Sequence, residues 1–304
     1  MIKTDYIKSS SDGLKIELAY IIPKGEIKGI VQISHGMSEH KERYFKFMEY
    51  LSENGYVCVI NDHRGHGNSV KDKADLGYFY TENTNFIIDD LHDVTLYIKN
   101  KYPNYKIYLF SHSMGTLVAR GYMQKYDNEM DKIVLCGTPT KNEFTLFAIA
   151  IAYLFKFIGF GKKPNKILNT LTFKAYNKSY KLENEWLSKN PNNISIYNDD
   201  ELCGFIFTTN GFINLYKLLK RAFNAKLYKV QNRNLEIFLI AGDNDPVIQN
   251  TKKFKQLEQF LNKLGYKNTK SKLYPDLRHE ILNEEEYNQI YKDILDFFID
   301  VKEK

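Results

Sequence analysis

The sequence predicts an α/β protein, in which a mostly parallel β-sheet is covered by helices on both faces and interrupted by an inserted, mainly helical segment. Short apolar runs typical of buried strands alternate with segments of helical spacing. This alternation stops over residues 139–230 and then resumes. A chain of 304 residues can also bury a large core as one fold. We therefore expect a core formed by residues 1–138 and 231–304, with a cap (lid) over residues 139–230.

Each expected strand is a run of mostly apolar residues bounded by turn residues. In chain order these runs are residues 14–22, 29–34, 56–60, 106–110, 132–136, 234–241 and 270–274. Each expected helix has apolar residues that recur every three or four positions. In chain order these segments are residues 41–54, 85–101, 116–123, 252–264 and 284 to about 302. Strands that alternate with helices should pair mostly in parallel, because each crossover helix returns the chain to the same edge of the sheet.

The pentapeptide SHSMG at residues 111–115 lies between an expected strand and an expected helix. A serine at the tip of such a turn stands above the sheet and faces a helix N-terminus, as in a nucleophile elbow. The first glycine of the usual pattern is Ser111 here, a departure that its small side chain makes tolerable. An ordinary turn that holds two serines is the alternative interpretation. Ser113 is the candidate nucleophile.

The loop HGMSEH at residues 35–40 follows an early strand. Acyl transfer to a serine places negative charge on an oxygen, and two preorganised backbone N–H groups can stabilise that charge. In the elbow architecture one donor is the residue after the nucleophile, and the other lies in the loop after an early strand. We expect the N–H groups of Met114 and Met37 to form this oxyanion hole.

Several motifs in this order make the chain resemble the serine α/β-hydrolases of the monoacylglycerol lipase and lysophospholipase group. They are HGMSEH at 35–40, DHRGHGNS at 62–69, SHSMG at 111–115, GDNDPV at 242–247 and RHE at 278–280. The resemblance covers about residues 13–298, except for the middle section. It implies the α/β-hydrolase fold with a cap and a serine hydrolase that needs no cofactor. It does not fix the substrate, because one fold hosts many chemistries.

The remaining catalytic residues follow in the order acid and then histidine in this fold. The resemblance places the acid three residues after Gly242 and so selects Asp245. The competing Asp243 is expected to bond the local backbone of the turn. His279 is the only histidine after His112, and as a general base it would accept the Ser113 proton while Asp245 holds its tautomer.

Metal binding is the alternative explanation of two other segments. His63 and His66 lie beside Asp62, but a zinc site needs a third and usually a fourth ligand of suitable geometry. The resemblance explains this segment as a turn that braces the floor of the site. Residues 243–245 lack the glycine and the closing glutamate of an EF-hand calcium loop. We expect no metal.

The apolar stretch at residues 144–160 is expected to hold the substrate. It is shorter than the roughly 20 residues that cross a bilayer, it contains Lys156, and strands of one sheet lie on both sides of it, so we reject a membrane span. A lid helix over an acyl pocket is favoured over a helix buried against the core. The expected pocket residues are Phe144, Phe147, Ile151, Leu154 and Phe155.

The predicted substrate is a single-chain lipid ester, either a monoacylglycerol or a lysophospholipid. A broad carboxylesterase, a thioesterase and a serine aminopeptidase use the same triad and stay open. An aminopeptidase needs carboxylates near the pocket to hold an ammonium group, and the cap offers Glu183, Glu185, Asp199, Asp200 and Glu201. A noncatalytic lipid-binding protein is less consistent with a complete set of Ser113, Asp245 and His279.

The formal net charge of +6 arises from scattered lysines rather than from a dense basic stripe. We therefore expect no nucleic-acid binding. We do expect weak, transient contact with an anionic membrane surface. The three cysteines, Cys58, Cys136 and Cys203, are odd in number and far apart, which favours a reducing compartment. No secretory leader is recognisable, so we expect a cytoplasmic protein. The oligomeric state stays open.

Overall fold

The computed structural model describes residues 1–177, 180 and 183–299, and it contains one eight-stranded sheet. The spatial order of the strands is β1-β2-β4-β3-β5-β6-β7-β8. Strands β1 and β2 pair antiparallel with their neighbours, and all later pairs are parallel. The strands are β1 (Lys3–Lys8), β2 (Lys15–Ile21), β3 (Gly29–Ser34), β4 (Tyr56–Asn61), β5 (Ile107–His112), β6 (Lys132–Cys136), β7 (Glu236–Gly242) and β8 (Asn268–Tyr274).

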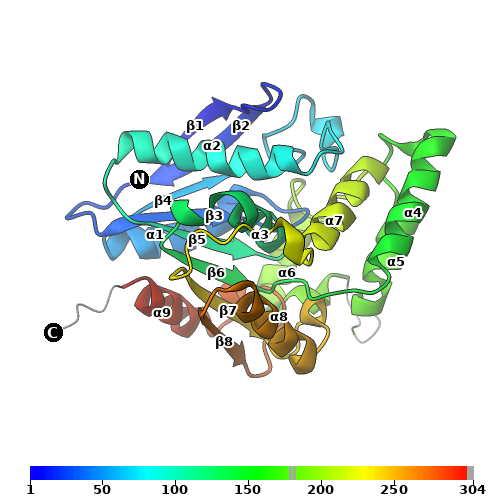
Figure 1. Cartoon of the computed structure of the whole chain (residues 1–304). Coiled ribbons are helices and arrows are strands. Elements are labelled where there is room, and N and C mark those ends of the chain that lie inside the picture. The colour runs from blue at the N-terminus through cyan, green and yellow to red at the C-terminus, as the bar shows by residue number, and fades with distance from the viewer. Residues whose placement is uncertain (178–179, 181–182, 300–304) are drawn as a thin grey trace.

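Helices cover both faces of this sheet, as predicted (Figure 1). One apolar cluster joins the sheet to α2, α3 and α8, and a second joins the opposite face to α1 and α9. The helices are α1 (Phe45–Glu53), α2 (Asn85–Lys101), α3 (Met114–Tyr126), α4 (Thr145–Phe155), α5 (Lys166–Asn177), α6 (Pro191–Asp199), α7 (Thr209–Ala222), α8 (Thr251–Leu264) and α9 (Tyr287–Phe298).

The structure corrects three of the expected elements. Strand β1 was not predicted, because as an edge strand it alternates exposed and half-buried residues and forms no apolar run. The helix expected at residues 41–54 begins with a 3₁₀ turn, and the α-helix starts only at Phe45. The last helix starts at Tyr287 and ends at Phe298; the end expected near residue 302 lies outside the described residues.

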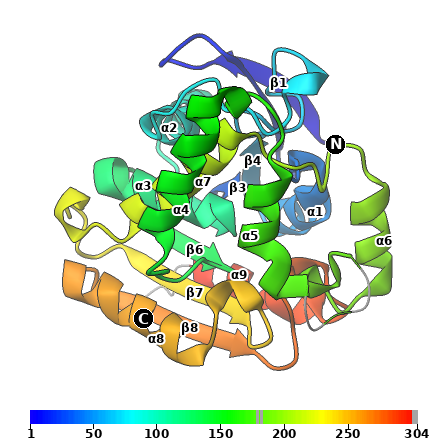
Figure 2. The same cartoon turned by 90° about the vertical axis from the view of Figure 1, so that its right-hand side faces the viewer.

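Four helices, α4 to α7, lie between β6 and β7, within the segment at residues 139–230 that we call the cap segment. Helix α7 packs against both α3 and α4, so it links the cap segment to the core. Figure 2 looks onto α4 and α5, with the sheet behind them. Helix α4 is followed by a π-helical turn at residues 156–160, in which Gly159 takes a positive φ. In the part of the chain that the structure describes, no helix combines the length and the apolar character of a membrane span.

Candidate active site

Ser113 lies at a strained turn between β5 and α3, with φ of 50° and ψ of −120°. The turn is tight: a Cβ atom at Gly115 would lie 2.2 Å from the carbonyl oxygen of Ser34. Ser111, which replaces the usual first glycine, fits because its hydroxyl donates to the Val134 carbonyl oxygen at 2.9 Å. Serine can therefore replace the usual glycine at position 111, because its hydroxyl finds a hydrogen-bond acceptor on the neighbouring strand β6.

The structure brings Ser113, His279 and Asp245 together at the carboxyl ends of β5, β8 and β7. The Nε2 atom of His279 lies 2.8 Å from the Ser113 hydroxyl oxygen, and its Nδ1 atom lies 2.9 Å from a carboxylate oxygen of Asp245. His279 and Asp245 are both buried, so little water competes for these hydrogen bonds. This geometry allows a general base to deprotonate a serine hydroxyl.

The two competing aspartates occupy different environments. Asp245 is 2% exposed and uses its second carboxylate oxygen to accept from the N–H of Val247 at 2.8 Å. Asp243 is exposed and accepts instead from the N–H of Asp276 at 2.8 Å, which bonds it to the loop that precedes His279. The expected bond to the local backbone of its own turn is therefore corrected: Asp243 bonds the backbone of a second loop, 33 residues further along the chain.

Met37 and Met114 both line the cavity beside Ser113. Met114 is the first residue of α3, so its N–H has no acceptor within the helix. Hydrogen bonds to the Glu39 side chain fix the loop that carries Met37. Glu39 accepts from the N–H of Gly36 at 2.5 Å and from the Tyr44 hydroxyl at 2.9 Å.

A buried charged network lies under this loop and next to the triad. Arg43 donates to Glu39 at 2.9 Å and to both carboxylate oxygens of Glu280 at 2.7 Å. His112 lies 3.3 Å from Glu39 and 3.2 Å from the carbonyl oxygen of His279. Sequence reasoning missed the link between Arg43 and Glu280, because it depends on a contact between distant segments.

The charges in this network stabilise one another. Burial by itself would raise the pKa of Glu39, but His112 and Arg43 hold that pKa well below its ordinary value. Burial would lower the pKa of His112, yet the neighbouring Glu39 raises it. We conclude that these ion pairs and hydrogen bonds fix both the loop at residues 35–40, which we call the oxyanion loop, and the backbone of His279.

A cavity of about 580 Å³ opens onto Ser113 and His279. Phe144, Phe147 and Ile151 line it, as expected for the cap segment. A further part of the apolar lining comes from α5 and α7 and was not predicted, because periodicity does not show which helices converge. These side chains are Leu168, Leu171, Phe173, Tyr176, Leu215, Tyr216 and Leu219.

Two expected pocket residues, Leu154 and Phe155, are corrected by the structure. Neither lines the cavity. Leu154 is 60% exposed, and Phe155 packs edge-on against Phe160 in the π-helical turn. The last turn of α4 extends beyond the cavity, where Tyr153 and Lys156 bond to Glu82 instead.

The other sequence candidates lie as follows. Of the five cap carboxylates considered for an ammonium group, Glu183 lines the cavity, and Glu185, Asp199, Asp200 and Glu201 do not. His63 and His66 are buried with His35 in a cluster of imidazole rings, whose centroids lie 4.4 and 5.3 Å from that of His35. Burial lowers the pKa of His63 to about 3 and that of His66 to about 4, so both rings are neutral packing groups.

Comparisons with known proteins agree with this architecture. The family model described as serine aminopeptidase, S33, matches residues 25–286. A monoacylglycerol lipase from Mycolicibacterium smegmatis is 21% identical over 94% of each chain. The human monoglyceride lipase is 28% identical over 64% of this chain and 58% of its own length. A solved carboxyl esterase from Bacillus coagulans superposes with a TM-score of 0.90 at 23% identity, over 97% of each chain, which shows that the fold is that of an α/β-hydrolase.

Proposed function

The chain belongs to the serine aminopeptidase S33 family and is a serine hydrolase of carboxylic esters, and on this premise we propose that it cleaves esters that carry a single acyl chain. Monoacylglycerols and lysophospholipids are the substrate classes that fit. The observation that carries the proposal is the cavity of about 580 Å³ next to Ser113. Its size falls within the roughly 300–1,000 Å³ of small-molecule sites, and most of its named lining is apolar.

In the proposed reaction, His279 takes the proton of Ser113 as the hydroxyl oxygen attacks the ester carbonyl carbon. The N–H groups of Met37 and Met114 stabilise the oxyanion of the tetrahedral intermediate. His279 then protonates the leaving alcohol, and an acyl-enzyme remains on Ser113. A water molecule, deprotonated by His279, releases the fatty acid by the same steps. Asp245 holds the His279 tautomer and stabilises the imidazolium throughout.

Aminoacyl amides are the alternative substrate class that the family description raises. They require free carboxylates for the substrate ammonium group, but two of the carboxylates that line the cavity, Glu39 and Glu280, are already paired with Arg43. Glu183, the third, is exposed. The paired charges and the apolar lining favour an acyl chain. Short-chain esters and thioesters can use the same triad, and a purely lipid-binding role would leave the hydrogen-bonded triad unused.

We further propose transient contact between the cap segment and a membrane surface. The cap segment exposes many large apolar side chains, and Lys162, Lys163 and Lys166 lie exposed among them. Apolar contact together with basic side chains favours anionic lipid surfaces. Between residues 144 and 171 the exposed large apolar side chains are Phe144, Leu146, Phe147, Leu154, Phe157, Ile158, Phe160, Ile167 and Leu171. The free cysteines Cys58, Cys136 and Cys203 support a cytoplasmic location.

The test compares kcat/KM across monoacyl esters of increasing chain length, lysophospholipids, triacylglycerols and aminoacyl amides. We expect kcat/KM to rise from acetyl to medium or long monoacyl esters, because each buried CH₂ contributes up to about 0.8 kcal/mol. Triacylglycerols should react slowly, since two further chains have no place in the cavity. A preference for acetyl esters or for aminoacyl amides would contradict the lipid assignment and leave the serine chemistry intact.

A further inference from the structure

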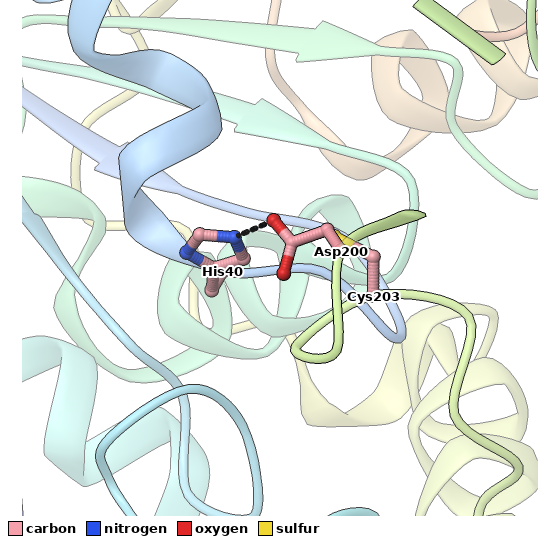
Figure 3. A group of neighbouring side chains, drawn as sticks. All are labelled: His40, Asp200 and Cys203. Carbon is pink, nitrogen blue, oxygen red and sulfur yellow. Dashed lines mark hydrogen bonds and ion pairs between the residues drawn. The ribbon is translucent and has the colours of Figure 1, made fainter. Parts of the chain in front are cut away.

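Three side chains with different metal-binding atoms meet outside the triad. His40 is the last residue of the loop at residues 35–40, whereas Asp200 and Cys203 belong to the turn after α6 (Figure 3). The imidazole nitrogen, the carboxylate oxygen and the thiol sulfur all lie within 4.8 Å of one another. His40 Nε2 is 2.8 Å from the Asp200 carboxylate. His40 and Cys203 are buried, which limits competition from bulk water.

We propose that His40, Asp200 and Cys203 form a binding site for a divalent transition-metal ion of the zinc type, with water as the fourth ligand. Nitrogen, oxygen and sulfur ligands at about 2.0–2.3 Å are the set that zinc uses. Those bond lengths place the ligand atoms of a tetrahedral ion roughly 3–4 Å apart, so only small side-chain movements are needed. A thiolate with an imidazole selects against magnesium and calcium, which prefer oxygen ligands.

Protonation balances as follows. Asp200 binds as the carboxylate that already pairs with His40 Nε2. Cys203 binds as the thiolate, so binding displaces the thiol proton. The imidazole binds through Nε2, and its proton moves to Nδ1. One proton is thus released for each ion bound.

One feature of the surroundings weakens the site. His40 Nδ1 is buried and has no hydrogen-bond partner within residues 1–177, 180 and 183–299, so it gains no acceptor when it becomes protonated. Arg43 is cationic, but its charge is balanced by Glu39 and Glu280. We therefore expect weaker binding than in structural zinc sites, whose histidines donate their second N–H to a partner.

The position of the site links the cap segment to the oxyanion loop. Ser38 accepts from the N–H of Gly204 at 2.9 Å and from the Tyr197 hydroxyl at 3.0 Å, and its own hydroxyl donates to the Phe205 carbonyl oxygen at 2.7 Å. Gly204 and Phe205 both line the cavity. A bound ion would replace the hydrogen bond between His40 and Asp200 by coordination and add Cys203, which would strengthen the connection between these segments. The inference does not depend on which ester the enzyme cleaves.

The test uses the purified full chain after metal removal, titrated with Co²⁺ as a spectroscopic probe and with Zn²⁺ by calorimetry. We expect one ion per chain, a thiolate-to-cobalt charge-transfer band and an increase in Tm with Zn²⁺. Cys203→Ser should abolish the band and weaken Zn²⁺ binding by more than about 100-fold, because even the loss of an outer partner costs roughly 10–100-fold. Asp200→Asn should weaken binding, whereas Asp199→Asn, an exposed neighbour, should bind like the wild type.

The wild-type cobalt spectrum is decisive even if a variant fails to fold, which circular dichroism reports. The absence of stoichiometric binding or of the charge-transfer band in the wild type overturns the proposal. So does a band that survives in a folded Cys203→Ser variant, since the thiolate would then be Cys58 or Cys136. Equal losses in Asp199→Asn and Asp200→Asn also overturn it.

Discussion

At the scale of single residues, the difference between Asp245 and Asp243 shows how environment assigns a role. The two carboxyl groups are two positions apart and chemically identical, but one is buried against His279 and the other is exposed on a loop. A buried carboxylate beside an imidazole can stabilise a developing positive charge, because little water screens it. The exposed carboxylate of Asp243 only holds the backbone of the loop at Asp276.

These environments predict different losses for the matched variants Asp245→Asn and Asp243→Asn. Asp245→Asn should reduce kcat by about 10⁴-fold, because His279 loses the partner that fixes its tautomer. Asp243→Asn should reduce kcat by less than about tenfold, because it weakens one hydrogen bond to the loop. The measurement is kcat for both variants on one water-soluble ester, with Tm as the control for folding. Equal losses, or the reverse order, mean that the acid is wrongly assigned.

At the scale of secondary-structure elements, the sequence predicts best the strands that are buried on both faces of the sheet. Strands β3 to β6 are fully buried, so they appear as continuous apolar runs and were found within one or two residues. Strand β1 has no such run and was missed. The lining of the cavity was only partly predicted, because it depends on how α4, α5 and α7 converge. Leu154 and Phe155 are apolar, as pocket residues should be, but they lie beyond the end of the cavity.

Helix α4 allows a matched test of the acyl pocket. Ile151 lines the cavity, whereas Leu154, three residues later, is exposed. Ile151→Asp should flatten the dependence of kcat/KM on acyl chain length, because a buried carboxylate disfavours an apolar chain beside it. Leu154→Asp should leave that dependence close to the wild type. The measurement is the slope of log kcat/KM against chain length in both variants. A loss of slope in Leu154→Asp alone would show that the chain binds elsewhere.

At the scale of the whole molecule, the order of motifs along the chain brings the site residues to one end of the sheet. Ser113, Asp245 and His279 follow three parallel strands, whose carboxyl ends meet at the same edge. This placement follows from topology and could be predicted from sequence. The ion-paired network around Arg43 and the cluster of His40, Asp200 and Cys203 could not, because each depends on contacts between segments that are distant in the chain.

Stability of the whole fold should fall as the pH drops below about 6.5. His35, His63 and His66 are buried, and burial depresses the pKa of each, to about 3 for His63 and about 4 for His66. In the unfolded chain they take up protons near pH 6.5, whereas in the folded chain they stay neutral. Their stabilisation is therefore fully present above pH 6.5 and is lost progressively as the pH falls towards the folded pKa values. His112, with its raised pKa, acts in the opposite direction.

The measurement is the free energy of unfolding by urea between pH 7.5 and 5, in the wild type and in His66→Asn. Each depressed histidine contributes a slope of up to about 1.4 kcal/mol per pH unit. His66→Asn lowers the free energy of unfolding at every pH. The slope of that free energy against pH should be smaller in the variant by about the contribution of one histidine. Carboxylates that titrate in this range are common to both proteins and cancel in the difference. Equal slopes in the wild type and the variant would show that His66 takes up its proton as readily in the folded chain as in the unfolded chain.

Covalent labelling can show whether Ser113 is the nucleophile of a hydrolase for single-chain esters. The enzyme is treated with a fluorophosphonate bearing one long alkyl chain, and the adduct is located by peptide mass spectrometry. We predict one adduct per chain, located on Ser113, that forms more slowly when a long monoacyl ester competes. Ser113→Ala should form no adduct and lose roughly four to six orders of magnitude in ester hydrolysis. A folded enzyme that is not labelled, or is labelled on another residue while Ser113→Ala stays active, contradicts the account.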